Sequence, residues 1–466
     1  VGNALSTAAL CGTFVLDETK ILVQCEHICP LKEALEELQA DKAKLEEKQT
    51  VWLRKAEERK LPKVQISAKE LPTETVVYEK LQDQYPGRAG EIVDQLSTEE
   101  LIALATGDPA KDQGASALGS AGQTVPGAAA ETVTVAEKAP YYVASIVLAD
   151  GPAGLRLRSE YQVREDGSID GGDFLDGFEN GYFAEPKESK GIVYHQYCTA
   201  IPVGTLLAQS WNLELMHTLG RMIAGEMNEF EVTLWLAPGM NIHRNPLCGR
   251  NFEYFSEDPY LAGELGKQMI LGLQAEGLAA TPKHFAVYSI PVGGRDGGTR
   301  TDPHVAPREM KTLYLEPFRK GIQEAGALGV MSSYNDYDGE PVSGSYHFLT
   351  EILRQQWGFK GYVVSDSEAV EFLHTKHRIT PTEEEMAAQV VNAGLNIRPN
   401  FPPPQDFILP LRRAISEGKI SLHTLDQRVG EILRVKFMLG LFDNPYPGDD
   451  RHPETVVHNA AHQEVS

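Results

Sequence analysis

The chain has 466 residues, of which 42% are hydrophobic and 23% are charged, and its formal net charge is −23. This length and composition are typical of a globular enzyme, with enough chain for a barrel of roughly 250 residues. So negative a chain repels phosphate backbones and anionic lipid, so we expect neither nucleic acid nor a membrane surface as a partner.

Five cysteines are spread along the chain: Cys11, Cys25, Cys29, Cys198 and Cys248. Their small, odd number argues against a disulfide scaffold and favours a cytoplasmic location. Cys25 and Cys29 flank His27, but no second ligand pair follows at zinc spacing, so we expect neither a metal site nor a cofactor. Secretion stays open as an alternative because the chain begins at Val1 rather than Met.

The first 90 residues predict two segments that precede the main domain. Two short apolar runs within residues 1–30 are separated by Asp17-Glu18-Thr19-Lys20 and indicate strands at the end of a partial β-sandwich. Residues 31–90 are expected to form a helical linker, because Leu31, Leu35 and Leu38 recur at helical spacing.

From about residue 140, short apolar runs alternate with amphipathic helical stretches. The runs are 143–150, 232–238, 280–285, 329–334, 362–366 and 394–398, with a weaker one at 199–202. This repetition predicts parallel strands with helical crossovers. We therefore predict an α/β fold, a (β/α)₈ TIM-type barrel over 91–445, followed by a C-terminal linker at 446–466. A doubly wound sheet is the alternative, but no Gly-rich phosphate turn follows the first run.

Polar side chains follow these predicted strands at the end of each run. They are Asp150, Arg250, Lys283, His284, Tyr334 and Asp366. In a parallel barrel the carboxyl ends of the strands share one mouth, so these groups are expected to converge. Carboxylates beside cationic donors suit glycoside cleavage, in which one carboxylate attacks the anomeric carbon or activates water. Asp366 is the candidate nucleophile, and Lys283, Arg250 and the Tyr334 hydroxyl are expected to keep it ionised.

Five motifs from residue 149 to 366 occur in a fixed order. They are Ala149-Asp150-Gly151-Pro152-Ala153-Gly154, Gly249-Arg250-Asn251-Phe252-Glu253-Tyr254-Phe255-Ser256-Glu257-Asp258-Pro259, Lys283-His284-Phe285, Met331-Ser332-Ser333-Tyr334-Asn335 and Val364-Ser365-Asp366. With them the chain resembles glycoside hydrolase family 3, the β-glucosidase and β-xylosidase family, from about Glu91 to Asn444. The resemblance implies a retaining exo-β-glycosidase that releases terminal non-reducing β-D-glucose from a small oligosaccharide or glycoside.

The resemblance also implies roles for the matching residues. Asp366 would be the nucleophile, and Tyr334 would lie against its carboxylate. Asp150 would hold the outer hydroxyls of the innermost sugar, while Arg250, Lys283 and His284 would bind the remaining ones. Three further positions are expected to support the site: Arg156 as a partner of these residues, and Glu253 and Asp258 as loop anchors.

Two departures from the family pattern leave alternatives open. Ser367 and Glu368 follow the nucleophile where many members have Trp, and with the loop at 293–298 they resemble members acting on xylosides. The segment 198–204 resembles β-glucosidases instead, so a β-xylosidase with the same mechanism is the close alternative. A Schiff-base aldolase using Lys283 is a more distant one.

The second departure concerns the general acid/base. In the family this Glu usually comes from an α/β-sandwich domain, which we expect to be missing from this chain. The chain therefore resembles a fragment of a member with permuted domain order, and the missing domain is expected to complete the site. An alternative from another class is a catalytically weak sugar-binding barrel. A homo-oligomer is also left open.

Overall fold

The computed structural model describes ten stretches of the chain, all within one compact unit, Val76–Ser466. They are 78–83, 87–106, 124–132, 143–165, 167, 169–170, 191–289, 301–399, 405–444 and 452–466. The β-sandwich remnant expected at 1–30, most of the helical linker expected at 31–90, the Cys25–Cys29 region and the 293–298 loop lie outside the described residues.

The central strands are parallel and buried, as the sequence predicts. β2 (Val147–Ala149), β6 (Leu234–Trp235) and β7 (Ala279–Ala280) are neighbours in parallel, and β8 (Gly329–Ser332) pairs in parallel with β11 (Tyr362–Ser365). Every residue of these five strands is buried. Burial on both faces explains why they read as continuous apolar runs rather than alternating ones.

Isolated parallel bridges continue this order beyond the regular strands. Lys283 pairs with Gly239, Phe285 with Ser332, and Ile397 with Val364. The predicted runs thus follow one another in chain order across the molecule, which confirms an α/β fold with parallel strands. Among the described residues these strands form an open series, and its first member, β1 (Ala130–Glu131), is antiparallel to β2.

The weak strand expected at 199–202 is not a strand. These residues run without sheet pairing, because other groups take their hydrogen bonds. The Ile201 N–H donates to the Ala153 carbonyl at 3.0 Å, and the Thr199 N–H donates to the Glu226 carboxylate at 2.8 Å. Local apolar character alone therefore gave the wrong expectation here.

Two small antiparallel sheets were not predicted from the sequence. β3 (Glu160–Val163) lies between β4 (Ile169–Asp170) and β5 (Ile192–His195), and β9 (Asp336–Tyr337) forms a hairpin with β10 (Glu340–Pro341). All of β5 is exposed, so its sequence carries no burial pattern that would identify it.

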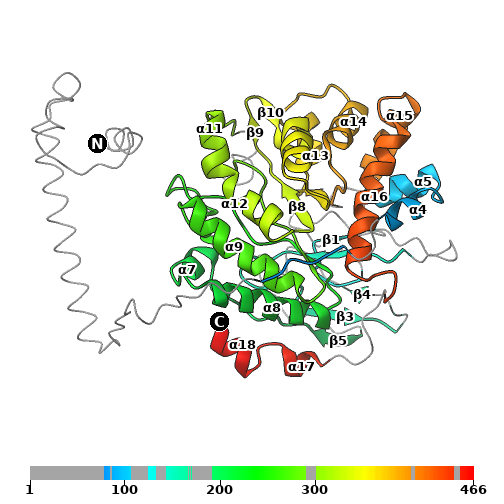
Figure 1. Ribbon diagram of the computed structural model, residues 1–466. Coiled ribbons are helices and arrows are strands. Elements are labelled where there is room, and N and C mark those ends of the chain that lie inside the picture. The colour runs from blue at the N-terminus through cyan, green and yellow to red at the C-terminus, as the bar shows by residue number, and fades with distance from the viewer. Residues whose placement is uncertain are drawn as a thin grey trace, which may run out of the picture. The chain divides into compact units, whose positions relative to one another are not determined.

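Helices fill the chain between the strands (Figure 1). The α-helices are α4 (Arg88–Val93), α5 (Thr98–Thr106), α7 (Gly204–Ala208), α8 (Leu213–Glu229), α9 (Pro259–Gln274), α11 (Pro307–Glu309), α12 (Glu316–Arg319), α13 (Ala369–Thr375), α14 (Glu383–Ala393), α15 (Gln405–Ser416), α16 (Leu422–Met438), α17 (Pro453–Val456) and α18 (Ala460–Val465). The 3₁₀- and π-helical segments are η1 (Asn251–Glu253), η2 (Met310–Tyr314), η3 (Lys320–Glu324), η4 (Val342–Gly344) and η5 (His347–Gln356). Side-chain caps begin several of them, as Asn212 does for α8 and Asp258 for α9. No helix among the described residues is both long and apolar enough to cross a membrane.

The last described segment, 452–466, packs against α8 through α17 and α18 (Figure 1). It is fixed by a buried carboxylate, since Glu226 of α8 has no exposed surface. One oxygen of Glu226 lies 2.9 Å from Nδ1 of His462, and the His458 N–H donates to the Thr199 hydroxyl at 2.8 Å. The residues expected to form a C-terminal linker thus include two helical turns held on the main body.

Candidate active site

A pocket of about 430 Å³, part of it open to solvent, lies where β2 and β11 end and β7 leads on to Lys283. Five of the six residues selected from the sequence line it: Asp150, Arg250, Lys283, His284 and Asp366. Arg156 and Ser367 also line it. The parallel strand ends bring these groups together across 216 positions of sequence, from 150 to 366, as the predicted topology requires.

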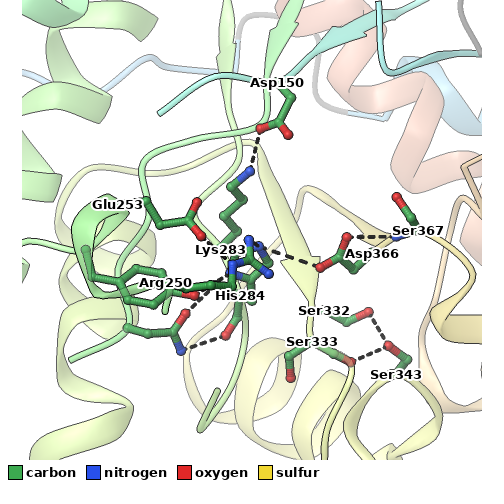
Figure 2. A network of polar contacts seen from close by, with 12 residues as sticks. Asp150, Arg250, Glu253, Lys283, His284, Ser332, Ser333, Ser343, Asp366 and Ser367 are labelled. Carbon is green, nitrogen blue, oxygen red and sulfur yellow. Dashed lines mark hydrogen bonds and ion pairs between the residues drawn. The ribbon is translucent and has the colours of Figure 1, made fainter. Parts of the chain in front are cut away.

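Asp150 lies at one side of the pocket and is held by two cations. Its Oδ1 lies 2.5 Å from Nζ of Lys283 (Figure 2). Its Oδ2 lies 2.9 Å from Nη2 of Arg156. Burial raises the pKa of Asp150. The charges of Lys283 and Arg156 and the hydrogen bonds lower it by more, so the pKa lies well below the usual range. Asp150 is therefore ionised at neutral pH.

A glycine makes the turn after Asp150 possible. Gly151 has φ +121°, and a Cβ at this position would lie 1.9 Å from the carbonyl oxygen of Gly154. The tight turn lets the Arg156 N–H donate to the Asp150 carbonyl at 2.8 Å. The Arg156 side chain consequently returns to the carboxylate, as the sequence suggested for this position.

Asp366 lies at the other side of the pocket, directly after β11. Its own N–H donates to the Ser332 carbonyl at 3.2 Å, and its Oδ1 accepts the Ser367 N–H at 2.8 Å. Its Oδ2 lies 3.6 Å from Nε2 of His284 (Figure 2). One carboxylate oxygen thus accepts a backbone N–H, while the other faces the His284 ring.

The electrostatics of Asp366 differ from the expectation. Burial raises its pKa, whereas Arg250, Lys283, the Ser367 amide and a hydrogen bond from Tyr334 lower it, and the net pKa lies above the usual value of 3.8. The predicted donors act in the predicted direction. The expectation that they dominate is wrong, because burial of the carboxylate raises its pKa more than these donors lower it.

Arg250 and His284 form the floor between the two carboxylates. The Nε of Arg250 pairs with Glu253, and its Nη2 lies 2.8 Å from Nε2 of His284. The other ring nitrogen of His284, Nδ1, lies 3.0 Å from the Tyr254 hydroxyl. Asn241 holds the His284 backbone, accepting its N–H at 2.7 Å and donating to its carbonyl at 2.9 Å.

Tyr334 donates a hydrogen bond to Asp366 but does not line the pocket. It is buried in a small aromatic cluster with Tyr288, Phe372 and Ala369. The Tyr288 ring lies edge-on to Tyr334 at 6.0 Å between centroids, and the Arg250 guanidinium lies 5.4 Å from the centroid of the Tyr288 ring. Tyr334 therefore lies in the same packed layer as the floor of the site.

The loop anchors expected from the sequence are confirmed. Glu253 is the partner of the Arg250 guanidinium, and Asp258 caps the first turn of α9 by accepting the Tyr260 N–H at 2.8 Å. Sequence reasoning missed Asn241, Tyr254 and Tyr288. Tyr254 could have been selected from the sequence, because it lies in the same motif as Arg250.

The comparisons with known proteins agree with this site. The family model described as "Glycosyl hydrolase family 3 N terminal domain" matches residues 185–435. Beta-glucosidase B of Emericella nidulans is 31% identical over 282 residues, which are 60% of this chain and 31% of that protein. Thermostable beta-glucosidase B of Acetivibrio thermocellus is 34% identical over 298 residues, which are 64% of this chain and 33% of that protein.

A solved structure, that of beta-glucosidase 3B from Thermotoga neapolitana in complex with glucose, superposes with a TM-score of 0.63. It is 31% identical, and the match covers 81% of this chain and 46% of that one. The chain thus spans about a third of the length of the curated relatives and less than half of the solved one. Because the family model covers more than half of the chain, the protein belongs to glycosyl hydrolase family 3.

Proposed function

We propose that this chain forms the (β/α)₈-type catalytic barrel of a retaining exo-β-glycosidase that releases terminal non-reducing β-D-glucose, with Asp366 as the nucleophile. The observation that carries the proposal is the buried carboxylate of Asp366 at the end of β11, in a pocket shared with Asp150, Arg250, Lys283 and His284. Relatives named beta-glucosidases support glucose as the sugar.

The two steps of a retaining mechanism match what Asp366 offers. In the first, its free carboxylate oxygen bonds to the anomeric carbon while the bond to the glycosidic oxygen breaks and that oxygen takes a proton. In the second, water attacks the same carbon, gives up a proton and releases Asp366. Arg250 and Lys283 lower the pKa of Asp366, which favours the anion that attacks.

Asp150 has a different role in this proposal. Its low pKa keeps it ionised, so it accepts hydrogen bonds from sugar hydroxyls and cannot supply a proton. The Lys283 ammonium beside it donates to the same hydroxyls. Together they close one end of the pocket, which is what removal of a single terminal sugar requires.

The general acid/base is proposed to come from an α/β-sandwich domain of the complete protein. Asp150 and Asp366 are the two carboxylates among the described residues that line the pocket, and each already has another role. By itself, then, this chain is expected to cleave glycosides whose leaving group needs no proton. It should be slow on natural disaccharides, which is also the behaviour of a weak sugar-binding barrel.

The decisive experiment compares wild type, Asp366→Ala and the control Asp338→Asn, an exposed position outside the pocket, on p-nitrophenyl β-glucoside and β-xyloside. We expect Asp366→Ala to lose at least about a thousand-fold in kcat, as nucleophile losses do. Added azide should restore turnover and yield the α-glucosyl azide, because azide attacks from the face that Asp366 leaves open.

The outcomes separate the alternatives. Faster cleavage of the xyloside than the glucoside would replace glucose by xylose as the substrate. Retention of more than a small fraction of the rate in Asp366→Ala, or formation of the β-glucosyl azide, would refute Asp366 as the nucleophile. A wild-type chain that binds glucose but turns over neither aryl glycoside would support the sugar-binding alternative.

A further inference from the structure

The hydrogen bonds around His284 determine which of its nitrogens carries the proton. Nε2 lies 2.8 Å from Nη2 of Arg250, and a guanidinium only donates. Nε2 must therefore present its lone pair to Arg250, and the ring proton must lie on Nδ1. His284 is then a neutral imidazole whose Nδ1–H donates to the Tyr254 oxygen, 3.0 Å away.

The opposite tautomer is disfavoured by the charge of Arg250. With the proton on Nε2, the Tyr254 hydroxyl would donate to Nδ1, but two N–H groups would face each other at 2.8 Å. A hydrogen bond from a charged donor is roughly twice as strong as one between neutral groups. The bond to Arg250 therefore outweighs the direction of the bond to Tyr254.

The charged and titratable groups near the ring agree with a neutral His284. Burial, then the charges of Arg250 and Lys283, lower the pKa of His284 well below its usual value. Asp366 is the anion that faces it, at 3.6 Å, and the Tyr254 and Tyr288 hydroxyls both have raised pKa values, because burial disfavours their ionised forms.

We infer that Arg250 fixes His284 as the Nδ1-protonated tautomer, and that Tyr254 is a positioning residue, which accepts the Nδ1 proton and so holds the ring against the Arg250 guanidinium. Tyr254 is fully buried beside His284 and does not line the pocket, so it acts through the ring and not on a substrate. Asn241 fixes the backbone of the same histidine on both sides.

Two consequences follow for the site. First, the single lone pair of Nε2 is used by Arg250, so in the empty site His284 positions the guanidinium instead of offering an acceptor to a sugar hydroxyl. Second, His284 has no proton to donate towards Oδ2 of Asp366, so that oxygen is not tied by an imidazole N–H. This second consequence rests on the proposed function, in which Asp366 attacks the sugar.

The first test is spectroscopic and needs no substrate. In protein labelled with ¹⁵N in the histidine rings, the signals of His284 are assigned by their loss in His284→Gln. We expect a protonated Nδ1 and an unprotonated Nε2, with no change between pH 5 and pH 8. A protonated Nε2, or an imidazolium at neutral pH, would overturn the inference.

The second test uses Tyr254→Phe with Tyr362→Phe as its matched control. Tyr362 is also fully buried, and its hydroxyl has no hydrogen-bond partner among the residues described. Tyr254→Phe should perturb the His284 signals and lower kcat/KM on the aryl glucoside about tenfold, the equivalent of one hydrogen bond. Tyr362→Phe should change neither. Unchanged His284 signals in Tyr254→Phe would refute the positioning role.

The two proposals fail separately. If the chain turns over no glycoside but His284 has the expected tautomer, the proposed activity falls and the positioning role stands. If Asp366 proves to be the nucleophile while Nε2 carries the proton, the activity stands and the positioning role falls.

Discussion

The two sides of the pocket hold the same chemical group in opposite electrostatic states. Asp150 and Asp366 are both aspartates at the ends of parallel strands, and burial raises the pKa of both. Direct ion pairs with Lys283 and Arg156 reverse this for Asp150. Among the described residues no Lys or Arg lies as close to Asp366, which keeps a raised pKa. Burial sets the cost of a carboxylate, and the distance to the nearest cation decides whether that cost is recovered.

The largest expected effect comes from breaking the Asp150 side. Asp150→Asn leaves the Lys283 ammonium, whose side chain is 3% exposed, without its anion. Removal of one partner of a buried ion pair typically costs about 3–5 kcal/mol, so we expect a loss of that order in the free energy of unfolding at pH 7. Urea denaturation measures it, with Asp338→Asn as the exposed control. A loss below about 1 kcal/mol would show that water reaches Lys283.

A lysine away from the pocket tests the same rule at a site where the described part of the chain supplies no ion-pair partner. Lys436 of α16 has no exposed surface and donates to the Ala144 carbonyl at 2.6 Å and the Thr132 hydroxyl at 3.0 Å. Burial lowers its pKa from 10.5 to about 7. The unfolded chain therefore binds more protons between pH 7 and pH 10.5, and the stability of the fold rises with pH across that window.

Lys436→Met is expected to remove this dependence. At pH 6 both folded and unfolded lysines are charged and the full cost of burial is present, so the variant should be more stable by about 1–3 kcal/mol. The gain should shrink as the pH rises from 7 to 10.5. Denaturation at pH 6, 8 and 10 would detect this. A variant that loses stability at pH 6 would mean that the two oxygens compensate the buried ammonium.

The sequence predicts the buried parts of the fold better than the exposed ones. The parallel strands were predictable, because burial on both faces leaves continuous apolar runs such as 362–366. The convergence of Asp150, Lys283 and Asp366 was predictable from strand ends alone. The exposed strand β5 was not, since nothing in its sequence distinguishes it from a loop.

The direction of each pKa shift lay beyond sequence reasoning for a physical reason. The sequence names the cations that could act on Asp366, but only the structure shows that Lys283 lies against Asp150 instead. The tautomer of His284 likewise depends on Tyr254 and Arg250, whose distances to the two ring nitrogens no motif encodes.

The electrostatics of Asp366 can be tested through the pH dependence of kcat/KM. Arg250 is the cation that lowers the pKa of Asp366 most. Its loss in Arg250→Gln should raise that pKa, so the acid limb of kcat/KM should move to higher pH. The pH profile on the aryl glucoside measures this, with Tyr362→Phe as the control. An unmoved limb would mean that the limb does not report Asp366.

The smallest expected effect is a gain in the free energy of unfolding on neutralising Asp366, opposite in sign to the loss expected for Asp150→Asn. The folded pKa of Asp366 lies above its unfolded value, so the folded state binds more protons between the two and stability falls as the pH rises through that window. At pH 7 the buried carboxylate therefore opposes folding, and Asp366→Asn should raise the free energy of unfolding by up to about 1 kcal/mol. Urea denaturation of this variant beside Asp150→Asn compares the two sides directly. If both variants lose stability, Asp366 is paired as firmly as Asp150. Opposite signs mean that Asp366, the proposed nucleophile, is kept buried at a cost to the stability of the fold.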